Sequence, residues 1–356
     1  MTPEDTRRRV AVVLFNLGGP DSPAAIGPFL RNLFSDPAIL RVPFFVRPFL
    51  ARLIARRRLA PARANYALLG GRSPLLEMTE AQAAALSAVL NEVRREDTVR
   101  CFVAMRYWHP FSAETAWAVK QWAPDRVVLL PLYPHFSTTT TGSSLDAWRK
   151  AACDAGLVAD VTSVCCYPAD RAFIDATVAG VGAAWAAART ALDPAIPLRV
   201  LFSAHGLPET IVRGGDPYQW QIERCVAAVL DAWDGAAPDH AICYQSRATP
   251  QKWLEPSTEQ EIARAARDQV ALLVVPIAFV SEHSETLVEL DIEYRHLAEK
   301  LGVPGYFRVP TQNVGAGFIA ALARLVGHAL DAGPGLCAAG AGRLCPVSFR
   351  GCPLAA

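Results

Sequence analysis

The sequence predicts an α/β protein with two similar doubly wound domains, each built on a mainly four-stranded parallel sheet flanked by helices. Short apolar runs without alternation recur along the chain, as in strands that are covered on both faces. Helix-like segments separate these runs and are long enough to serve as crossover connections. Hydrophobic residues make up 52% of the 356 residues, which is enough for two sizeable cores.

Eight strand-like runs fall into two sets of four. The first set is 10–16, 99–107, 126–134 and 160–168, and the second is 198–204, 240–246, 270–279 and 305–310. Residues 171–192 lie between the sets and have the spacing of one long helix. We therefore expect an N-terminal domain over 1–170 and a C-terminal domain over 171–330, whose last helix, 315–330, could pack on either domain. A cysteine-containing tail, 331–356, follows.

Charge and motifs exclude several classes of function. The net charge of +1 gives no indication of a nucleic-acid partner, and no run of 18 apolar residues predicts a spanning helix. The first residues lead directly into a strand-like run and lack the apolar segment and cleavage site of a signal peptide, so we expect a cytoplasmic protein. No P-loop, GxGxxG, HExxH, GxSxG or CxxC pattern is present, which leaves nucleotide binding, nucleophilic catalysis and zinc hydrolysis unsupported.

Several histidines mark the ends of predicted strands. His109, His135, His205 and His283 each lie just past such an end. Ligands of open α/β sheets bind beyond the carboxyl ends of the strands, so these histidines are candidates for a functional site. A single histidine at this position is more often a structural, hydrogen-bonded residue, but four of them favour a site.

A row of acids follows His283. Glu285, Glu289 and Glu293 recur at every fourth residue, which would place three carboxylates on one face of a helix. One interpretation is a solvated helix face. The other is a line of oxygen ligands and proton carriers that begins at the histidine. The strongly apolar run ALLVVPIAFV directly precedes this segment, which favours an enclosed position for the histidine and the acids.

The segment 43–66 is apolar, aromatic and basic at once. It could be buried core with a solvated basic edge. Alternatively, it could be an exposed apolar lip that touches a membrane surface or admits an apolar anionic ligand.

Seven motifs together resemble those of the ferrochelatases and appear in the order of that family. They are NLGGPDS, GGRSP, MRYWHP, LYPHFSTTTTGSS, FSAHGLP, YQSRATPQKWLEP and PIAFVSEHSETLVELDIEY. The resemblance extends from about residue 10 to about residue 330. It implies two Rossmann-like domains with a porphyrin cleft between them. It also implies insertion of Fe(II) into protoporphyrin IX, giving protoheme and two protons, as the terminal step of heme biosynthesis.

The resemblance also implies the site residues. It places His205 and Glu285 at the metal-insertion centre, His283 in the pocket and Glu289 on an acidic path that leads away. The segment 43–66 corresponds to the active-site lip of the family. The implied substrate-binding residues are Arg58, Tyr66 and Ser73 for the porphyrin propionates, and Asn16, Leu17, Arg106, Tyr107 and Trp253 at other pocket-lining positions.

The chemistry suits these residue types. Imidazole and carboxylate together are acceptable ligands for Fe(II), and an imidazole can accept the ring protons near neutral pH. We expect the cleft to bend the macrocycle so that His205 takes protons from the pyrrole nitrogens. Glu285 would face the metal, and Glu289 would exchange protons with solvent. Whether His205 acts as a base, as a metal ligand or as both is left open by the sequence.

The tail contains three cysteines, Cys337, Cys345 and Cys352. Some ferrochelatases carry a [2Fe–2S] cluster on four cysteines, three of them near the C-terminus, so these residues are candidate cluster ligands. The animal enzymes take the fourth from a loop in which this chain has Thr138. The remaining candidates for the fourth ligand are Cys153, Cys165 and Cys166. The alternative is a tail with free thiols.

Other functions remain as alternatives. The substrate could be coproporphyrin III instead of protoporphyrin IX, although the apolar lip favours the latter. A non-catalytic tetrapyrrole-binding protein would not need the histidine and acid set. A chelatase for another metal or ring, such as one that inserts cobalt into a corrin precursor, is disfavoured by the segment HSETLVELDIEY. Peripheral contact with the inner membrane through the lip is a further expectation, and the oligomeric state is open.

Overall fold

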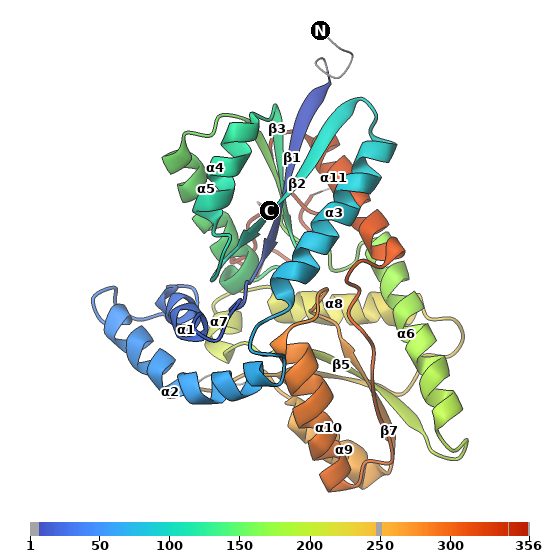
Figure 1. Cartoon of the computed structure of the whole chain (residues 1–356). Coiled ribbons are helices and arrows are strands. Elements are labelled where there is room, and N and C mark those ends of the chain that lie inside the picture. Colours follow the sequence, from blue (N-terminus) through green and yellow to red (C-terminus); the bar gives the residue numbers. More distant parts are fainter. Residues whose placement is uncertain (1–6, 247–250, 341, 355–356) are drawn as a thin grey trace. The chain divides into compact units, whose positions relative to one another are not determined.

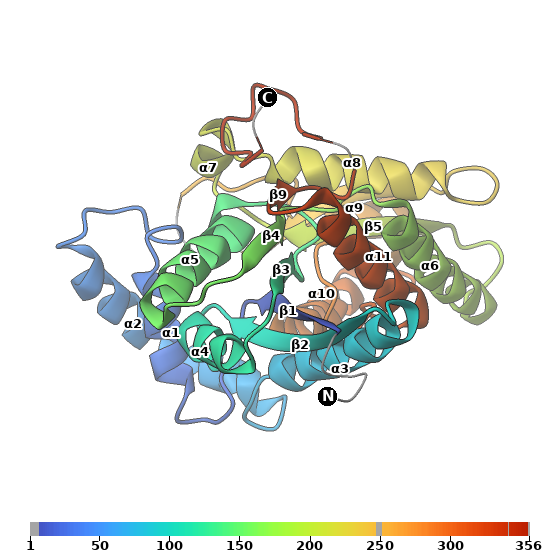
Figure 2. The same cartoon turned by 90° about the horizontal axis from the view of Figure 1, so that it is seen from above.

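The computed structural model describes residues 7–246, 251–340 and 342–354 (Figures 1 and 2). The chain forms two compact units. The first comprises Met1–Cys166, Leu322–Leu344 and Pro353–Ala356, and the second comprises Tyr167–Ala321 and Cys345–Cys352. Residues 247–250, which belong to the motif YQSRATPQKWLEP, lie outside the described residues. Among the described helices, none is both long and apolar enough to cross a membrane.

The first unit is built on a five-stranded parallel sheet with the strand order β2-β1-β3-β4-β9. Its strands are β1 (Arg8–Asn16), β2 (Asp97–Met105), β3 (Arg126–Pro131), β4 (Asp160–Val164) and β9 (Gly335–Cys337). The apolar residues Val10 to Phe15 of β1 are at most 1% exposed. Burial on both faces explains why this run shows no alternation of polar and apolar residues.

Helices cover both faces of this sheet (Figure 2). On one face, α4 (Ser112–Trp122) and α5 (Ser143–Ala155) pack Val119 and Trp148 against Phe15 and Leu129. The other face is covered by α3 (Leu75–Val93) and the later turns of α11 (Ala316–Ala332). Two helices, α1 (Ile26–Ser35) and α2 (Arg47–Ala67), pack together around a separate apolar cluster, and a short π-helix, η2 (Thr138–Gly142), precedes α5.

The second unit is built on a four-stranded parallel sheet with the order β6-β5-β7-β8. Its strands are β5 (Leu198–His205), β6 (His240–Gln245), β7 (Ala271–Pro276) and β8 (Tyr306–Arg308). One face packs against α9 (Thr258–Asp268), the π-helix η3 (Glu285–Glu293) and α10 (Tyr294–Leu301). The remaining helices are α6 (Arg171–Ala191), the short α7 (Glu209–Arg213) and α8 (Tyr218–Asp231).

The predicted fold class is confirmed, because both sheets are parallel and flanked by helices. The long helix expected at 171–192 is α6. The last predicted strand, however, is only three residues long, and β9 adds a fifth strand to the first sheet within the expected tail. That strand pairs with β4 from Thr162↔Gly335 to Val164↔Cys337. The sequence did not predict β9, because the tail is rich in Gly, Ala and Pro. Within β9, the side chain of Leu336 packs against the apolar core of the first unit.

Candidate active site

The first candidate residue, His205, ends the buried strand β5. Every other residue of β5 is buried, and the strand lies between β6 and β7. His205 therefore occupies the carboxyl end of a central strand, where open α/β sheets place their ligands. Its Nδ1 atom is shielded from solvent and has no hydrogen-bond partner among the described residues. The side chain is 37% exposed, so the ring can still be reached.

The glycine after His205 allows the chain to turn closely past its neighbours. A Cβ atom at Gly206 would lie 2.9 Å from the carbonyl oxygen of Gln245 and 3.3 Å from the ring of Trp253. The Gly206 amide donates a hydrogen bond to the same carbonyl oxygen at 2.7 Å. Trp253 is buried and packs beside this turn, next to His205. These close contacts explain why a glycine follows His205.

The second histidine, His283, is buried and oriented by its own loop. Its Nδ1 lies 3.1 Å from the carbonyl oxygen of Ser281, and its backbone amide donates to Thr286 Oγ1 at 3.0 Å. A carbonyl oxygen only accepts hydrogen bonds, so Nδ1 must carry a proton. The other ring nitrogen, Nε2, faces Glu285 Oε2 at 3.5 Å. A proton gained by His283 therefore resides at Nε2, opposite a carboxylate.

Glu285 lies between the two histidines. Its Oε2 atom is 3.5 Å from His283 Nε2 and 3.9 Å from His205 Nδ1, and its side chain is 28% exposed. Burial alone would raise the pKa of this carboxyl. The charges of His205 and His283 outweigh that effect and lower the pKa to about 2. Glu285 is thus a carboxylate that stabilises positive charge on either imidazole.

Glu289 is the next acid on η3, and three polar side chains hold it. It accepts hydrogen bonds from Gln245 Nε2 at 3.0 Å, from Tyr294 OH at 3.0 Å and from Ser246 Oγ. Burial, and then the charge of Glu285, raise the pKa of the Glu289 carboxyl. Two acids four residues apart therefore differ in proton affinity, as expected for an acid–base pair.

The helix type of this segment differs from the expectation. Residues 285–293 form a π-helix instead of an α-helix, and Tyr294 N donates to the Glu289 carbonyl oxygen five residues earlier. π-helical turns are frequent at functional sites. The solvated-face interpretation fits Glu293, which is exposed, but not Glu285 and Glu289, whose side chains are partly buried.

In the first unit, a buried carboxylate organises two of the predicted substrate residues. Asp36 is 4% exposed and accepts hydrogen bonds from Tyr107 OH at 2.8 Å and Ser143 Oγ at 2.5 Å. Arg106 forms an ion pair with the same oxygen of Asp36 at 2.7 Å and donates to Ser143 at 2.6 Å. Tyr107 is fully buried, whereas the Arg106 side chain keeps 23% of its surface exposed.

The other predicted residues of the first unit lie around the end of β1. Asn16 is buried, donates to Thr79 Oγ1 and accepts a hydrogen bond from the amide of Leu17. Leu17 packs in the same apolar cluster as Tyr66 and Tyr107. The buried Ser73 lies close to this strand end, because a Cβ atom at Gly19 would be 2.5 Å from its side chain.

Arg58 lies on the exposed side of α2, in the segment that the sequence identifies as a lip. The aromatic residues that precede it are exposed: Phe44 by 79%, Phe45 by 64% and Phe49 by 78%. Residues 41–67 contain seven arginines and no acidic residue. The lip is therefore an exposed apolar and basic segment rather than buried core.

The tail cysteines are distributed over both units. Cys337 lies in β9 of the first unit, where burial and the neighbouring Cys166 raise the pKa of its thiol to about 11. Cys345 and Cys352 are buried in the second unit, and Gln221 Nε2 lies 3.1 Å from Cys345 Sγ. Over residues 7–246, 251–340 and 342–354, no group of three or more His, Cys, Asp or Glu side chains is arranged to hold a metal ion.

The remaining strand-end histidines have structural surroundings. His109 is exposed and its Nδ1 contacts Glu114 at 2.9 Å. Burial lowers the pKa of His135 to about 3, so this ring stays neutral at physiological pH. Only two of the four strand-end histidines thus meet a carboxylate in a partly enclosed position.

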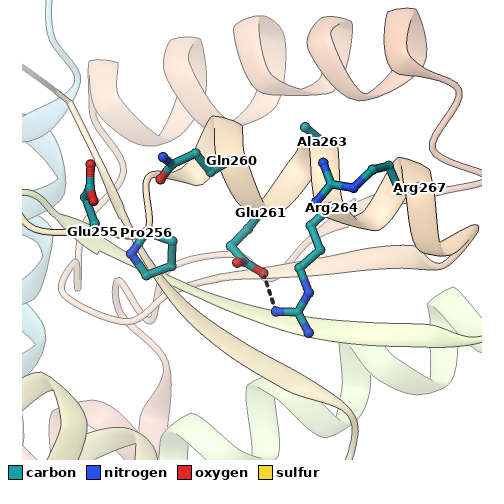
Figure 3. A pocket seen from close by; sticks show the side chains of 7 residues that line it. All are labelled: Glu255, Pro256, Gln260, Glu261, Ala263, Arg264 and Arg267. Carbon is teal, nitrogen blue, oxygen red and sulfur yellow. Dashed lines mark hydrogen bonds and ion pairs between the residues drawn. The ribbon is translucent and has the colours of Figure 1, made fainter.

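A surface pocket in the second unit contains none of the predicted residues (Figure 3). It lies along α9 and has a volume of ≈ 590 Å³. Its lining residues are Glu255, Pro256, Gln260, Glu261, Ala263, Arg264 and Arg267. Arg264 turns toward the buried Glu261 and forms an ion pair with it at 3.1 Å. The lining residues include neither a histidine nor a cysteine.

Sequence reasoning missed three residues that position the site. Asp36 holds Arg106, and Gln245 and Ser246 hold Glu289. Gln245 directly opposes His205 in the parallel pair of β5 and β6, a register that the structure reveals and the sequence alone does not. Ser246 adopts a φ of 64°, in the left-handed region, which is uncommon for a residue with a Cβ atom and recurs at functional sites.

Comparisons with known proteins identify the family of this chain. The family model of the ferrochelatases matches residues 9–330. The ferrochelatase of Hyphomonas neptunium is 50% identical over 353 residues, which cover 98% of this chain and 95% of that protein. The ferrochelatase of Caulobacter vibrioides is 48% identical and covers 97% of both chains. Among solved structures, the sirohydrochlorin chelatase SirB of Bacillus subtilis subspecies spizizenii, in complex with cobalt, shares the fold, with a TM-score of 0.50 and 10% identity over 91% of this chain and 96% of that chain.

The match spans almost the whole chain, and the identity to these relatives is far above the level that defines a family. The predicted resemblance is therefore confirmed, and the alternatives of a cobalt chelatase and a non-catalytic binding protein are not supported. This chain belongs to the ferrochelatase family, the metal chelatases that insert iron into a porphyrin in heme biosynthesis.

Proposed function

We propose that this enzyme inserts Fe(II) into protoporphyrin IX, with His205, Glu285, His283 and Glu289 as its catalytic residues. The observation that supports this proposal most directly is the carboxylate of Glu285 between two imidazoles at the end of β5. A metal that enters the ring displaces two N–H protons, and a histidine is the side chain best suited to accept them near neutral pH. General-base catalysis of this kind contributes roughly 10²–10⁴-fold.

The roles follow from the distances. The His205 side chain is 37% exposed and its Nδ1 faces Glu285, so His205 is the group that accepts a proton from a pyrrole nitrogen. Glu285 stabilises the imidazolium that results and also faces the incoming iron, which is a substrate. His283 takes its own proton at Nε2 and shares the same carboxylate. Glu289, whose pKa is raised, receives protons from this cluster.

Replacement of the first histidine tests these roles. We expect His205→Ala to lower the single-turnover rate of anaerobic Fe(II) insertion by at least about 100-fold. The matched control is His296→Ala, an exposed histidine on α10, which should insert iron at the wild-type rate. Equal rates for the two variants would contradict the assignment.

We also propose that Arg58, Tyr66 and Ser73 bind the propionates, with Asn16, Leu17, Arg106, Tyr107 and Trp253 around the ring. The exposed residue Arg58 and the exposed aromatic side chains of the lip support a substrate with a charged and an apolar edge. Protoporphyrin IX has vinyl groups on its apolar edge, whereas coproporphyrin III has four propionates. Steady-state assays with both porphyrins test this choice, and a higher kcat/KM for coproporphyrin III would reverse it.

The same lip supports contact with a membrane, and hence a place in the cytoplasm at the surface of the inner membrane. Exposed phenylalanines beside an arginine-rich helix suit an anionic bilayer surface. Phe44→Ser with Phe49→Ser should reduce co-sedimentation with phosphatidylglycerol vesicles. The control Val158→Ser replaces an apolar residue that is 92% exposed elsewhere and should leave it unchanged. Equal binding by both variants would contradict a membrane contact through the lip.

A [2Fe–2S] cluster on Cys337, Cys345 and Cys352 has less support. These thiols belong to different units, and the described residues contain no set of three ligands at metal-binding spacing. No catalytic step is derived through this cluster. Iron and acid-labile sulfide analysis of anaerobically purified protein decides the question: two of each per chain would establish the cluster, and none would exclude it.

A further inference from the structure

The hydroxyl of Tyr294 lies between two carboxylates. It is 3.0 Å from Glu289 Oε1 on η3 and 3.3 Å from Glu259 Oε1 on α9. Tyr294 itself is 5% exposed and packs in the core of the second unit. Glu259, in contrast, is exposed to solvent. This hydroxyl therefore joins a partly buried acid of the candidate active site to an acid at the surface.

The π-helix explains how Tyr294 reaches Glu289. The two residues are five apart, and the Tyr294 amide donates to the Glu289 carbonyl oxygen. In an α-helix, residues five apart point about 140° away from each other, because each residue turns the chain by about 100°. A π-helix has i→i+5 hydrogen bonds, which place such residues nearly above one another. The unusual helix thus creates this contact.

A phenol has one proton, so Tyr294 cannot donate to both carboxylates at once. When both acids are ionised, only one of the two contacts is a hydrogen bond. When Glu289 carries a proton, both contacts become favourable: Glu289 donates to the Tyr294 oxygen, and Tyr294 donates to Glu259. Burial and the charge of Glu285 favour protonation of Glu289, and the charge of His205 opposes it. Both contacts of the Tyr294 hydroxyl are therefore hydrogen bonds when Glu289 carries one proton.

We propose that Tyr294 relays protons from Glu289 to Glu259 and so to solvent. In each transfer, the O–H bond of the Glu289 carboxyl breaks and a new O–H bond forms on the Tyr294 oxygen. At the same time the original Tyr294 O–H bond breaks and the proton passes to the Glu259 carboxylate. Rotation of the Tyr294 hydroxyl and loss of the Glu259 proton to buffer restore the starting state. This inference rests on the proposed role of Glu289 as the acceptor of protons displaced from the porphyrin.

The transfer is concerted, because a free tyrosinate is strongly disfavoured here. Burial is the largest cause that raises the pKa of Tyr294, and the charges of Glu289 and Glu259 raise it further. Ser246 and Gln245 fix the other oxygen of Glu289, so Oε1 remains directed to Tyr294. The Glu289 end of the relay is therefore held in place by hydrogen bonds to its other oxygen.

The test is single-turnover insertion of ferrous iron in weakly buffered anaerobic solution, where proton release limits the rate. Tyr294→Phe keeps the ring in the core but removes the hydroxyl, and Glu259→Gln removes the surface acceptor. We expect each variant to be at least about tenfold slower than wild type, and the double variant to be no slower than the slower single variant. The matched control is Glu299→Gln, an exposed acid on the same helix as Tyr294, which should react at the wild-type rate.

Two further readouts separate a relay from a structural role. A higher concentration of imidazole buffer should restore the rate of Glu259→Gln, because a small base replaces the lost acceptor. The dissociation constant for porphyrin, measured by fluorescence, should stay within about twofold of wild type. Wild-type rates for Glu259→Gln, or a slow rate that buffer does not restore, would overturn the relay. If His205→Ala also reacted at the wild-type rate, the proposed function would fail; a slow His205→Ala with fast relay variants would refute the relay alone.

Discussion

Two polar clusters of this enzyme differ in how closely their charges are paired. Around Asp36, the guanidinium of Arg106 and the hydroxyls of Tyr107 and Ser143 all lie within 2.8 Å of one carboxylate. Around Glu285, the two imidazoles lie at 3.5 and 3.9 Å. The distances around Asp36 are those of hydrogen bonds, whereas the distances from Glu285 to the two imidazoles are longer than hydrogen bonds. The Asp36 cluster is therefore satisfied by the protein itself.

The largest expected effect is on the reaction rate, and it comes from the Glu285 cluster. Glu285→Gln keeps the shape of the side chain but removes the charge between the two histidines. We expect the single-turnover rate of Fe(II) insertion to fall by roughly 10²–10⁴-fold, because neither imidazolium is then stabilised. Stopped-flow absorbance of the porphyrin measures this rate. A loss of less than threefold would remove Glu285 from the catalytic set.

In the Asp36 cluster, we expect a substitution to lower the free energy of unfolding of the protein. Asp36→Asn leaves the Arg106 guanidinium without its partner. Breaking a fully buried ion pair costs about 3–5 kcal/mol, and the cost should be lower here because Arg106 is 23% exposed. Urea unfolding of the whole chain, followed by circular dichroism, measures the change. Stability within 0.5 kcal/mol of wild type, on the order of an exposed surface pair, would contradict a scaffold role.

Replacement of the glycine after His205 tests how tightly the end of β5 is packed. Gly206→Ala would bring a Cβ atom to 2.9 Å from the Gln245 carbonyl oxygen and 3.3 Å from the Trp253 ring. Neither neighbour can withdraw easily, so we expect a loss of about 1–3 kcal/mol in stability, as for an overpacked core. Thermal unfolding tests this estimate, and an unchanged or higher Tm would show that the turn has room to adapt.

The smallest effect concerns acid stability. The pKa of Glu285 is lowered from 4.5 to about 2 in the folded enzyme. Its charged form therefore contributes stability that is fully present above about pH 4.5 and is lost as the pH falls toward 2. The stability gap between wild type and Glu285→Gln should narrow over that range. Urea midpoints measured from pH 6 to pH 3 provide the comparison, and a gap that does not change with pH would contradict the lowered pKa.

The sequence was sufficient to predict most of the fold and several of the side chains that lie together at the end of β5. Fully buried parallel strands have a clear apolar signature, and a histidine at the end of such a strand, as at His205, points to a ligand site. β9 could not be predicted in this way. It has only three residues and owes its conformation to pairing with β4, a tertiary effect without a local pattern.

The details of the site depended on helix type and on distant partners. A spacing of four between Glu285 and Glu289 fits an α-helix as well as a π-helix, so the sequence does not reveal that Tyr294 would reach Glu289. Asp36 lies 70 residues before Arg106 and has no motif of its own, yet it fixes that side chain. Such partners become visible only once the chain has folded.

The central claim is that His205 and Glu285 act as one acid–base unit, and a double-mutant cycle on single-turnover Fe(II) insertion tests it most directly. His205→Ala, Glu285→Gln and the double variant are compared with wild type under the same anaerobic conditions. For residues that act as a unit, the double variant should be no slower than the slower single variant. Rate losses that multiply in the double variant would show that the two side chains act independently and would contradict the account.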